Sequence, residues 1–306
     1  MHSNEQLRQR VILVMGGTTG IGAAVVRATL AEGAYVVAVG RDPSQAAPLN
    51  EQLGPRAERL HVLAGDATCP ETAQQAVQWA MQTWHRLDGL VHIAGGSGRS
   101  LGDGPLHSVS TSGWQETLRW NLDSVFFSNR AALNVFIRQR SGCIVNMTSV
   151  LASHPSPRYF GTHAYAAAKA AIVGMTQAAA AYYAPFHIRV NAIAPGLVAT
   201  PMAQRALHDE EIRSYIANKQ PLKSGGVLDP EDIAGLVVFL LSDAACSITG
   251  QIIAVDAGWS VTDSGSVPNP DQTCQEPPTK PINDTRQNAT PQNCAPQNSG
   301  LQNTLD

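Results

Sequence analysis

The chain has 306 residues, of which 43% are hydrophobic and 15% charged, with a formal net charge of −3. These proportions are typical of a globular protein that buries a sizeable core. The charge balance has no basic surplus to attract nucleic acid or an anionic membrane, so we expect neither as a partner.

The numbers and spacing of cysteine and histidine residues indicate the redox environment of the protein and whether it has a metal site. The five cysteines are an odd number without a CxxC pair, which predicts reduced thiols. The nine histidines show no ligand spacing such as HxxxH, so we expect no metal. Residues 1–10 hold no apolar signal region, and no apolar run reaches the roughly 20 residues of a membrane span. A cytoplasmic protein is expected.

Seven short β-rich runs alternate with helical stretches along the chain. The predicted strands are Val11–Gly16, Tyr35–Gly40, Leu60–Gly65, Gly89–Ala94, Cys143–Met147, Ile188–Ile193 and Gln251–Val255. The first two are nearly continuous hydrophobic runs, which is typical of strands covered on both faces of a parallel sheet. One helix shows apolar residues at steps of three and four: Ala73, Ala76, Val77, Ala80, Met81 and Trp84. The pattern predicts an α/β fold with a doubly wound, parallel, seven-stranded Rossmann-type sheet in three α/β/α layers.

The end of the chain differs from the rest in composition. Residues 263–306 contain no Phe, Trp or Tyr and are rich in Pro, Asn and Gln. Such a segment cannot bury enough apolar surface to offset its ordering entropy. We therefore predict one folded domain over residues 1–262 and a disordered tail over residues 263–306.

A glycine-rich turn follows the first predicted strand and precedes a helix over Ala23–Glu32. Its residues are Gly16, Gly17, Thr18, Thr19, Gly20, Ile21 and Gly22. Glycines allow a tight turn and a close backbone approach to a pyrophosphate, and the helix N-terminus supplies free N–H donors. A plain strand-to-helix turn is the competing explanation, but the position in the first βα unit favours a dinucleotide site.

The ends of the second and third strands bear on the adenosine half of such a cofactor. An acidic residue ending the second strand would favour NAD, but Gly40 stands there and Arg41 follows. The Arg41 cation can pair with a 2′-phosphate, so NADP is expected, with NAD as the alternative and a solvated surface Arg41 as the competing explanation. Asp66 and Ala67 are placed to meet the adenine, although Asp66 could equally cap the next helix.

Hydroxyl and amine groups gather at the ends of later strands. Tyr165 and Lys169 are four apart and therefore share one face of a helix. The strand before them ends in Thr148 and Ser149, and a later strand runs into Pro195-Gly196. Strand carboxyl ends are where doubly wound folds bind ligands.

Taken together, these motifs resemble the short-chain dehydrogenase/reductase family over roughly residues 8–260. The residues that carry the resemblance are Gly16, Gly20, Gly22, Asp66, Ala94, Gly95, Asn121, Ser149, Tyr165, Lys169, Asn191, Pro195, Gly196, Thr200 and Asp256. Their order and spacing agree along the whole domain.

The resemblance implies a role for each catalytic position. Tyr165 would be the general acid/base and Ser149 would hydrogen-bond the substrate oxygen. Lys169 would hold the nicotinamide ribose and lower the pKa of Tyr165, and Asn121 would support a water that connects Lys169 to solvent. Cofactor contacts are further implied at these positions: Ala94, Gly95, Pro195, Gly196, Val198 and Thr200.

Three departures from the family pattern are visible. Met15 replaces a usual Thr beside the glycine turn, which predicts the loss of one hydrogen bond. His92-Ile93 replaces an Asn pair that supports the central sheet. Ser149 and Tyr165 are 16 apart, about three more than usual, so the inserted residues should reshape the substrate mouth. This insertion leaves Ser153 as a near alternative to Ser149.

The predicted activity is hydride transfer between NADP(H), or NAD(H), and a ketone or secondary alcohol. The alternatives are a catalytically inactive cofactor-binding regulator and a dehydratase or epimerase without net cofactor consumption. Residues 201–226, with Arg205, Arg213 and Lys219, are expected to form a lid; these cations could favour an anionic or carrier-bound acyl substrate, or lie on a solvated helix face. The family further implies a homotetramer or homodimer that pairs through helices over Trp114–Arg138 and Tyr165–Tyr183.

Overall fold

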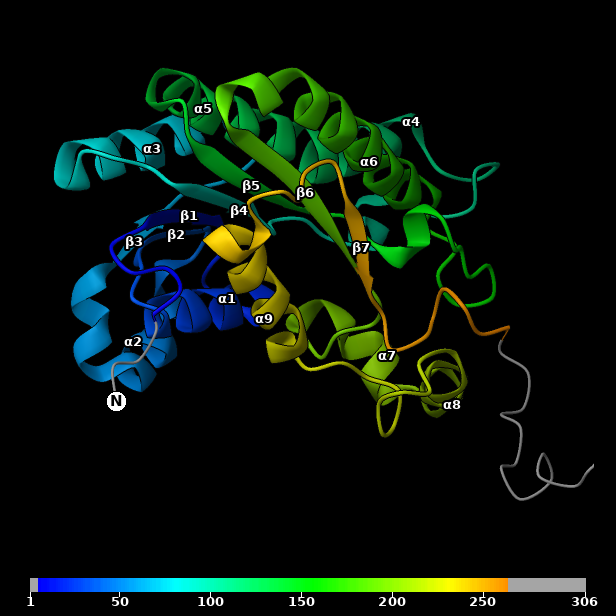
Figure 1. Ribbon diagram of the computed structural model, residues 1–306. Coiled ribbons are helices and arrows are strands. Elements are labelled where there is room, and N and C mark those ends of the chain that lie inside the picture. The colour runs from blue at the N-terminus through cyan, green and yellow to red at the C-terminus, as the bar shows by residue number, and fades with distance from the viewer. Residues whose placement is uncertain (1–4, 264–306) are drawn as a thin grey trace, which may run out of the picture. The chain divides into compact units, whose positions relative to one another are not determined.

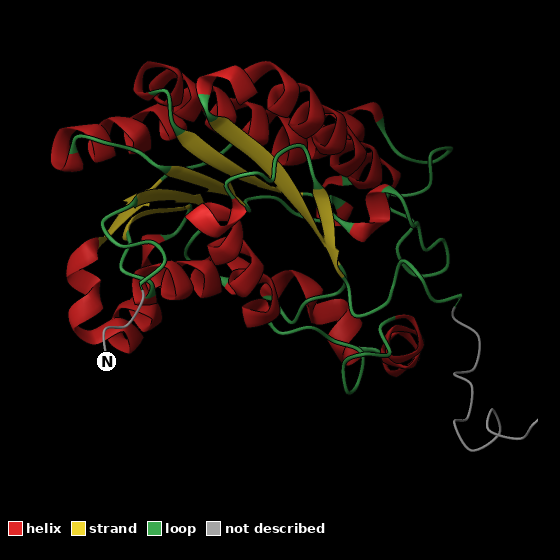
Figure 2. Ribbon diagram, in the orientation of Figure 1, coloured by secondary structure: helices red, strands yellow, loops and turns green. Residues whose placement is uncertain are grey.

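The computed structural model describes residues 5–263, so the tail predicted over residues 263–306 lies outside the described residues except for Asp263. Its centre is a parallel sheet with the strand order β3-β2-β1-β4-β5-β6-β7 (Figures 1 and 2). The strands are β1 (Val11–Met15), β2 (Tyr35–Gly40), β3 (Leu60–Ala64), β4 (Gly89–His92), β5 (Gly142–Met147), β6 (Ile188–Pro195) and β7 (Ile252–Val255). All seven predicted strands and the parallel, doubly wound sheet are confirmed.

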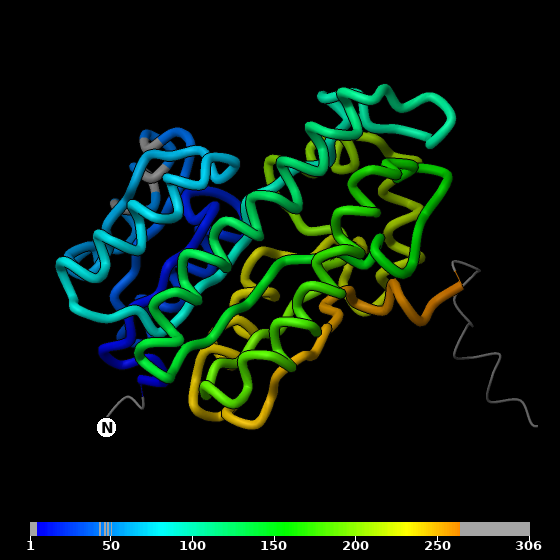
Figure 3. The backbone as a smooth tube through the Cα atoms, turned by 90° about the horizontal axis from the view of Figure 1, so that it is seen from above, coloured from blue at the N-terminus to red at the C-terminus, as the bar shows by residue number. Residues whose placement is uncertain are grey.

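Helices cover both faces of the sheet, which gives the three predicted layers (Figure 1). They are α1 (Gly20–Ala31), α2 (Ala47–Leu53), α3 (Pro70–Trp84), α4 (Thr111–Leu118), α5 (Ser124–Gln139), α6 (His163–Tyr183), α7 (Gln204–His208), α8 (Glu210–Lys219) and α9 (Pro230–Leu241). Helices α1, α2 and α9 lie on one face, and α3, α5 and α6 lie on the other. Seen from above, these last three lie next to one another over the sheet (Figure 3).

Alternation along β1 explains why both faces of the sheet are apolar. Ile12 and Val14 pack in a buried cluster with α1 and α9, whereas Leu13 and Met15 pack in a second cluster with α3 and α5. Successive side chains of a strand point to opposite faces, so a strand with helices on both sides must be hydrophobic throughout. The apolar face predicted for α3 packs in this second cluster, where Ala73, Ala76, Val77 and Ala80 are buried.

The strand order reverses beside β1, and this reversal positions the site. β1 pairs with β2 on one side and with β4 on the other, and the chain leaves these strands towards opposite faces. A crevice forms at such a switch point, at the carboxyl ends of the strands. The Met15 carbonyl joins the two strand ends there, accepting from the N–H groups of Ile93 (2.9 Å) and Ala94 (3.0 Å).

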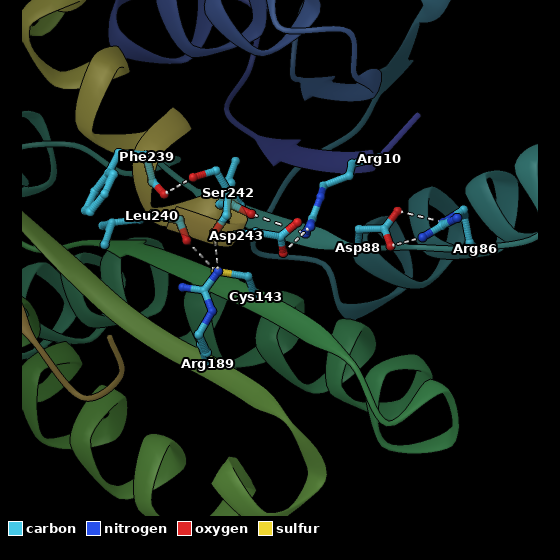
Figure 4. A network of polar contacts seen from close by, with 10 residues as sticks. Arg10, Arg86, Asp88, Cys143, Arg189, Phe239, Leu240, Ser242 and Asp243 are labelled. Carbon is cyan, nitrogen blue, oxygen red and sulfur yellow. Dashed lines mark hydrogen bonds and ion pairs between the residues drawn. The ribbon is translucent and has the colours of Figure 1, made fainter. Parts of the chain in front are cut away.

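The amino ends of the strands are fixed by a separate polar network (Figure 4). Arg10 pairs with Asp243 at 2.6 Å, and Arg189 donates to the Ser242 carbonyl at 3.2 Å. Asp88 accepts from the backbone N–H of Val11 at 2.8 Å. The two arginine contacts tie this end of the sheet to the segment that follows α9, and the Asp88 contact ties the segment before β4 to β1.

A small third cluster covers one side of the crevice. Its buried members are Val150, Ala206, Ile212, Ile216 and Trp259. The predicted lid therefore consists of α7 and α8 packed on the segment after β5. Two hydrogen bonds add to the packing: Ser156 donates to the Tyr215 hydroxyl (2.9 Å), and Trp259 donates to the His154 carbonyl (3.1 Å).

The structure also bears on the expectations about a membrane span, a metal site and a subunit interface. No helix among residues 5–263 is both long and apolar enough to cross a bilayer. Within the same residues, no group of three His, Cys, Asp or Glu side chains could hold a metal ion. On α5, Val125 is buried but Phe126 is 45% exposed, and pairing of subunits through this helix stays a prediction.

Candidate active site

A cavity of about 820 Å³ lies at the carboxyl ends of the central strands. It contains the predicted site residues with two exceptions, Gly22 and Asn121. The lining residues among those predicted are Gly16, Thr18, Gly20, Ile21, Arg41, Asp66, Ala67, Ala94, Gly95, Ser149, Tyr165, Lys169, Pro195, Gly196, Val198 and Thr200. Residues from seven different segments of the chain thus meet in one space.

Two positions of the glycine turn have no room for a side chain. Gly16 has φ +84°, and a Cβ there would lie 2.7 Å from the Ala94 backbone nitrogen. At Gly22 a Cβ would lie 1.8 Å from the Gly16 carbonyl oxygen, so any side chain would push α1 away from the turn. Gly22 therefore serves the packing of the helix on the turn and does not line the cavity.

On the adenosine side, Arg41 lies over the ring of Trp120 at 5.0 Å from the guanidinium carbon to the ring centroid. Asp66 lines the cavity and accepts from the N–H of Thr68 at 2.8 Å in the loop before α3. The N-cap of α3 is Cys69, so Asp66 does not cap that helix. Burial alone would raise the pKa of Asp66, but bonds from Thr68 and the nearby Arg41 and Arg119 lower it on balance. Asp66 is therefore an anion held between cations, with Arg41 facing the same cavity.

At the centre of the site, the first turn of α6 presents Tyr165 towards β5. Burial raises the pKa of the Tyr165 phenol, and a hydrogen bond with the Ser149 hydroxyl opposes that rise. Burial therefore outweighs the hydrogen bond in the chain without cofactor, and the expected lowering of this pKa by Lys169 stays a prediction.

Lys169 lies one turn further along α6, and its Nζ is 5.5 Å from the centre of the Tyr165 ring. Its ammonium group donates to the Met147 carbonyl at 2.9 Å. Burial lowers the pKa of Lys169 to about 8. The side chain is therefore a cation at neutral pH, fixed at the end of β5 beside the tyrosine.

Asn121 lies in a π-helical turn over residues 119–123 between α4 and α5, fully buried. Its Oδ1 accepts from the N–H of Gly96 at 3.0 Å, and its Nδ2 donates to the carbonyls of Gly96 (2.9 Å) and Thr117 (3.0 Å). The amide thus fixes the glycine segment after β4, next to Lys169. The expected water contact of Asn121 stays a prediction.

His92, the departure at the end of β4, is buried in a polar cluster. Its Nδ1 is 2.7 Å from the Ser128 hydroxyl, and its Nε2 is 3.2 Å from the Ala94 carbonyl. Burial, and next the charge of Lys169, lower the pKa of His92 to about 3. A neutral imidazole therefore replaces the amide that the family places here and joins the sheet to α5.

The structure separates alternatives that the sequence left open. Ser149 lines the cavity and bonds to Tyr165, whereas Ser153 is exposed, pairs with His154 at 2.9 Å and does not line the cavity. Of the three cations in the predicted lid, Arg205 lines the cavity, but Arg213 and Lys219 do not.

Sequence reasoning missed several residues of the site. Trp120 and Arg99 line the cavity, and Asp103 accepts from the N–H groups that begin α6. No local pattern marks any of them. Arg99 and Asp103 follow the Ala94-Gly95 motif in a loop without periodicity, and only the fold brings this loop to α6.

Comparison with known proteins agrees with this geometry. Residues 16–260 match the family model described as enoyl-(acyl carrier protein) reductase. The chain is 35% identical to 2-(S)-hydroxypropyl-CoM dehydrogenase 3 of Xanthobacter autotrophicus, over 84% of this chain and 99% of that protein. It is 32% identical to the 3-oxoacyl-(acyl-carrier-protein) reductase FabG of Thermotoga maritima, over 83% and 98%.

Solved structures give the same result. A short-chain type dehydrogenase/reductase from Mycobacterium ulcerans is 33% identical, with a TM-score of 0.77 over 84% of this chain and 92% of that one. The structure of ElxO with NADP bound is 26% identical, with a TM-score of 0.74 over 82% and 98%.

Proposed function

The chain belongs to the short-chain dehydrogenase/reductase family, and we propose that it interconverts a ketone and a secondary alcohol with NADP(H) preferred over NAD(H). It is an NAD(P)-dependent oxidoreductase acting on CH–OH groups. The observation that carries the proposal is the meeting of Ser149, Tyr165 and Lys169 with the glycine turn in one cavity.

The residues present fit a dinucleotide. A Cβ at Gly16 would clash with the Ala94 backbone, so glycine lets the turn pack closely against the segment after β4, and both residues line the cavity. The N-terminus of α1 opens into the same space, and free N–H groups there suit a pyrophosphate. Arg41, Asp66 and Ala67 would hold the adenosine end, with Arg41 on a 2′-phosphate.

The nicotinamide end would lie on the opposite side of the turn. Pro195, Gly196, Val198 and Thr200 line that part of the cavity, and a Cβ at Gly20 would lie 3.1 Å from Thr200 Cγ2. The carbons of Thr200 thus close over the turn. When bound, the cofactor supplies or accepts a hydride and, in its oxidised form, adds a positive charge.

The chain's own residues would handle the proton. In the direction of reduction, the Tyr165 hydroxyl donates its proton to the substrate oxygen, and Ser149 hydrogen-bonds that oxygen. Moving a phenol from pKa near 10 to near 7 takes about 4 kcal/mol. The Lys169 ammonium, whose Nζ is 5.5 Å from the centre of the Tyr165 ring, would favour the phenolate, whereas burial opposes it.

Oxidation of the reduced cofactor tests the proposal. The full-length protein is assayed with NADPH and NADH against 3-oxoacyl thioesters, sugars, steroids and quinones, in both directions. Turnover with one of these classes supports oxidoreduction. Cofactor binding without any turnover favours the regulator instead, and product formation at constant reduced-cofactor absorbance favours the dehydratase or epimerase.

A further inference from the structure

Two arginine side chains meet on the substrate side of the cavity. Arg99 follows β4, Arg205 lies in α7, and both line the cavity that contains Tyr165. The Nη2 of each donates to the same acceptor, the Tyr159 carbonyl oxygen, at 2.8 Å in both cases. The two guanidinium groups are therefore neighbours, although they come from segments about a hundred residues apart in the sequence.

No carboxylate in the described part of the chain pairs directly with either guanidinium group. Within residues 5–263, neither Arg99 nor Arg205 forms an ion pair with a carboxylate, in contrast to Arg158, which pairs with Glu211. Burial and then the repulsion from Arg205 lower the pKa of Arg99, while Asp103 acts in the opposite direction.

Asp103 does not neutralise the pair by direct contact. Its two carboxylate oxygens accept from the backbone N–H groups of Ala164 (3.0 Å) and Tyr165 (2.9 Å). The Tyr159 carbonyl is neutral, so it orients the two guanidinium groups without compensating their charge. Two like charges held together near a cavity are stabilised by a bound anion.

The neighbourhood suits a small organic anion. Leu151, Phe160, Met202 and Trp259 also line the cavity, and the Arg205 guanidinium carbon lies 5.8 Å from the centre of the Phe160 ring. A guanidinium presents a fork of N–H donors that matches an oxyanion, and the Tyr159 carbonyl engages only one nitrogen of each. Apolar lining residues beside two guanidinium groups would suit a ligand with a short carbon chain and a terminal oxyanion.

We propose, on the basis of the function proposed above, that the substrate carries a terminal oxyanion bound by Arg99 and Arg205 while its carbonyl or carbinol carbon faces Tyr165. The expected substrates are thus oxo acids and hydroxy acids, and not neutral ketones. Carboxylate, sulfonate and phosphate share the required chemistry, and the substrate series below distinguishes them.

The test compares charged and neutral forms of one carbon skeleton. Methyl ketones with a carboxylate two to five carbons from the carbonyl are assayed beside their methyl esters, and beside a ketosulfonate and a ketophosphate of the best length. We expect kcat/KM for the preferred anion to exceed that of its ester by roughly 10- to 100-fold, which corresponds to one charge-assisted hydrogen bond.

Three variants connect the preference to these residues. Arg99→Gln and Arg205→Gln should each reduce the ratio of kcat/KM for anion over ester, mainly through KM for the anion. Arg213→Gln is the matched control: it removes the same charge from the lid, but Arg213 does not line the cavity. It should leave the ratio unchanged. Melting temperatures show whether each variant is folded.

The outcomes separate this inference from the function on which it rests. Turnover of esters and anions at equal kcat/KM overturns the anion site while oxidoreduction stands. An equal loss on both substrates in Arg205→Gln also overturns it, because that result means that the arginine only supports Tyr159. Absence of turnover with every ketone and alcohol overturns both proposals.

Discussion

The carboxylate of Asp103 accepts a hydrogen bond from the backbone N–H of Tyr165 at 2.9 Å, although the two residues are 62 positions apart. A second bond, from the N–H of Ala164, joins the same carboxylate to the first turn of α6. Thr162, the residue before the helix, makes no capping bond with its side chain. Asp103 therefore caps α6 from a distant loop and fixes the turn that carries the tyrosine.

Replacing Asp103 should thus affect stability and turnover together. Asp103→Ala leaves two helix N–H groups without an acceptor, which costs about 1–2 kcal/mol of unfolding free energy. We expect kcat to fall while the Kd for the cofactor stays near that of the wild type, because Asp103 does not line the cavity. Asp103→Asn keeps one acceptor and should restore part of both losses.

Ser110→Ala is the control for this prediction. Ser110 caps α4 by accepting from the N–H of Gly113 at 3.0 Å, and it too does not line the cavity. The Ser110→Ala substitution should lower the unfolding free energy by a similar amount without lowering kcat. Equal kcat in Asp103→Ala and Ser110→Ala would show that the capping of α6 does not position Tyr165.

Cofactor choice should depend on Arg41. A charge-assisted bond to a 2′-phosphate contributes about 1.5–3 kcal/mol, or roughly 10- to 150-fold in affinity. Arg41→Ala should therefore raise the Kd for NADPH by that factor and leave the Kd for NADH nearly unchanged, as measured by fluorescence titration. Arg119→Ala is the control, since Arg119 also lies near Asp66 but does not line the cavity. Equal effects of Arg41→Ala on both cofactors contradict the phosphate contact.

His92 predicts an acid-sensitive step in stability. Its pKa is lowered from 6.5 to about 3 in the folded chain, so the unfolded chain binds one more proton between these values. The unfolding free energy must then fall as pH drops below 6.5, by about 2 kcal/mol at pH 5. Denaturant titrations at pH 7 and pH 5 measure this loss.

The comparison with His92→Asn isolates the histidine. An amide in the same place has no proton to gain, so this variant should lose less stability between pH 7 and pH 5 by that amount. A similar loss in both proteins would assign the acid sensitivity to other groups.

The two serines before α6 should behave differently. Ser149 bonds to Tyr165 in the cavity, and removal of a hydrogen bond to a reacting oxygen costs roughly 100- to 1,000-fold in kcat. Ser149→Ala should show such a loss, whereas Ser153→Ala should retain turnover because Ser153 is exposed and outside the cavity. A larger loss in Ser153→Ala would reverse the assignment.

The sequence predicted those parts of the molecule that depend on local pattern. The strands follow from their hydrophobic runs, and Tyr165 and Lys169 share a helix face because they are four apart. The roles of Gly22 and Asn121 could not be derived in this way. Gly22 packs α1 on the turn, and the Asn121 amide holds Gly96, and both contacts depend on how separate segments meet.

The same limit explains the residues that were missed. Arg99, Asp103 and Trp120 act through partners far along the chain: the Tyr159 carbonyl, the start of α6 and the guanidinium of Arg41. The burial that raises the pKa of Tyr165 could not be predicted either, because spacing along the helix places Lys169 nearby but does not show how deeply the phenol lies.

Turnover of Tyr165→Phe is the most direct measurement of the central claim. The substitution removes one hydroxyl, so the melting temperature and the Kd for NADPH should stay close to those of the wild type. Loss of a general acid costs roughly 100- to 10,000-fold in rate. We predict a fall in kcat of at least the lower figure with the best ketone of the panel, while Lys169→Ala should lose both kcat and cofactor affinity. Retention of kcat within about tenfold in a folded, NADPH-binding Tyr165→Phe variant would contradict Tyr165 as the proton donor, because the general-acid contribution exceeds that range.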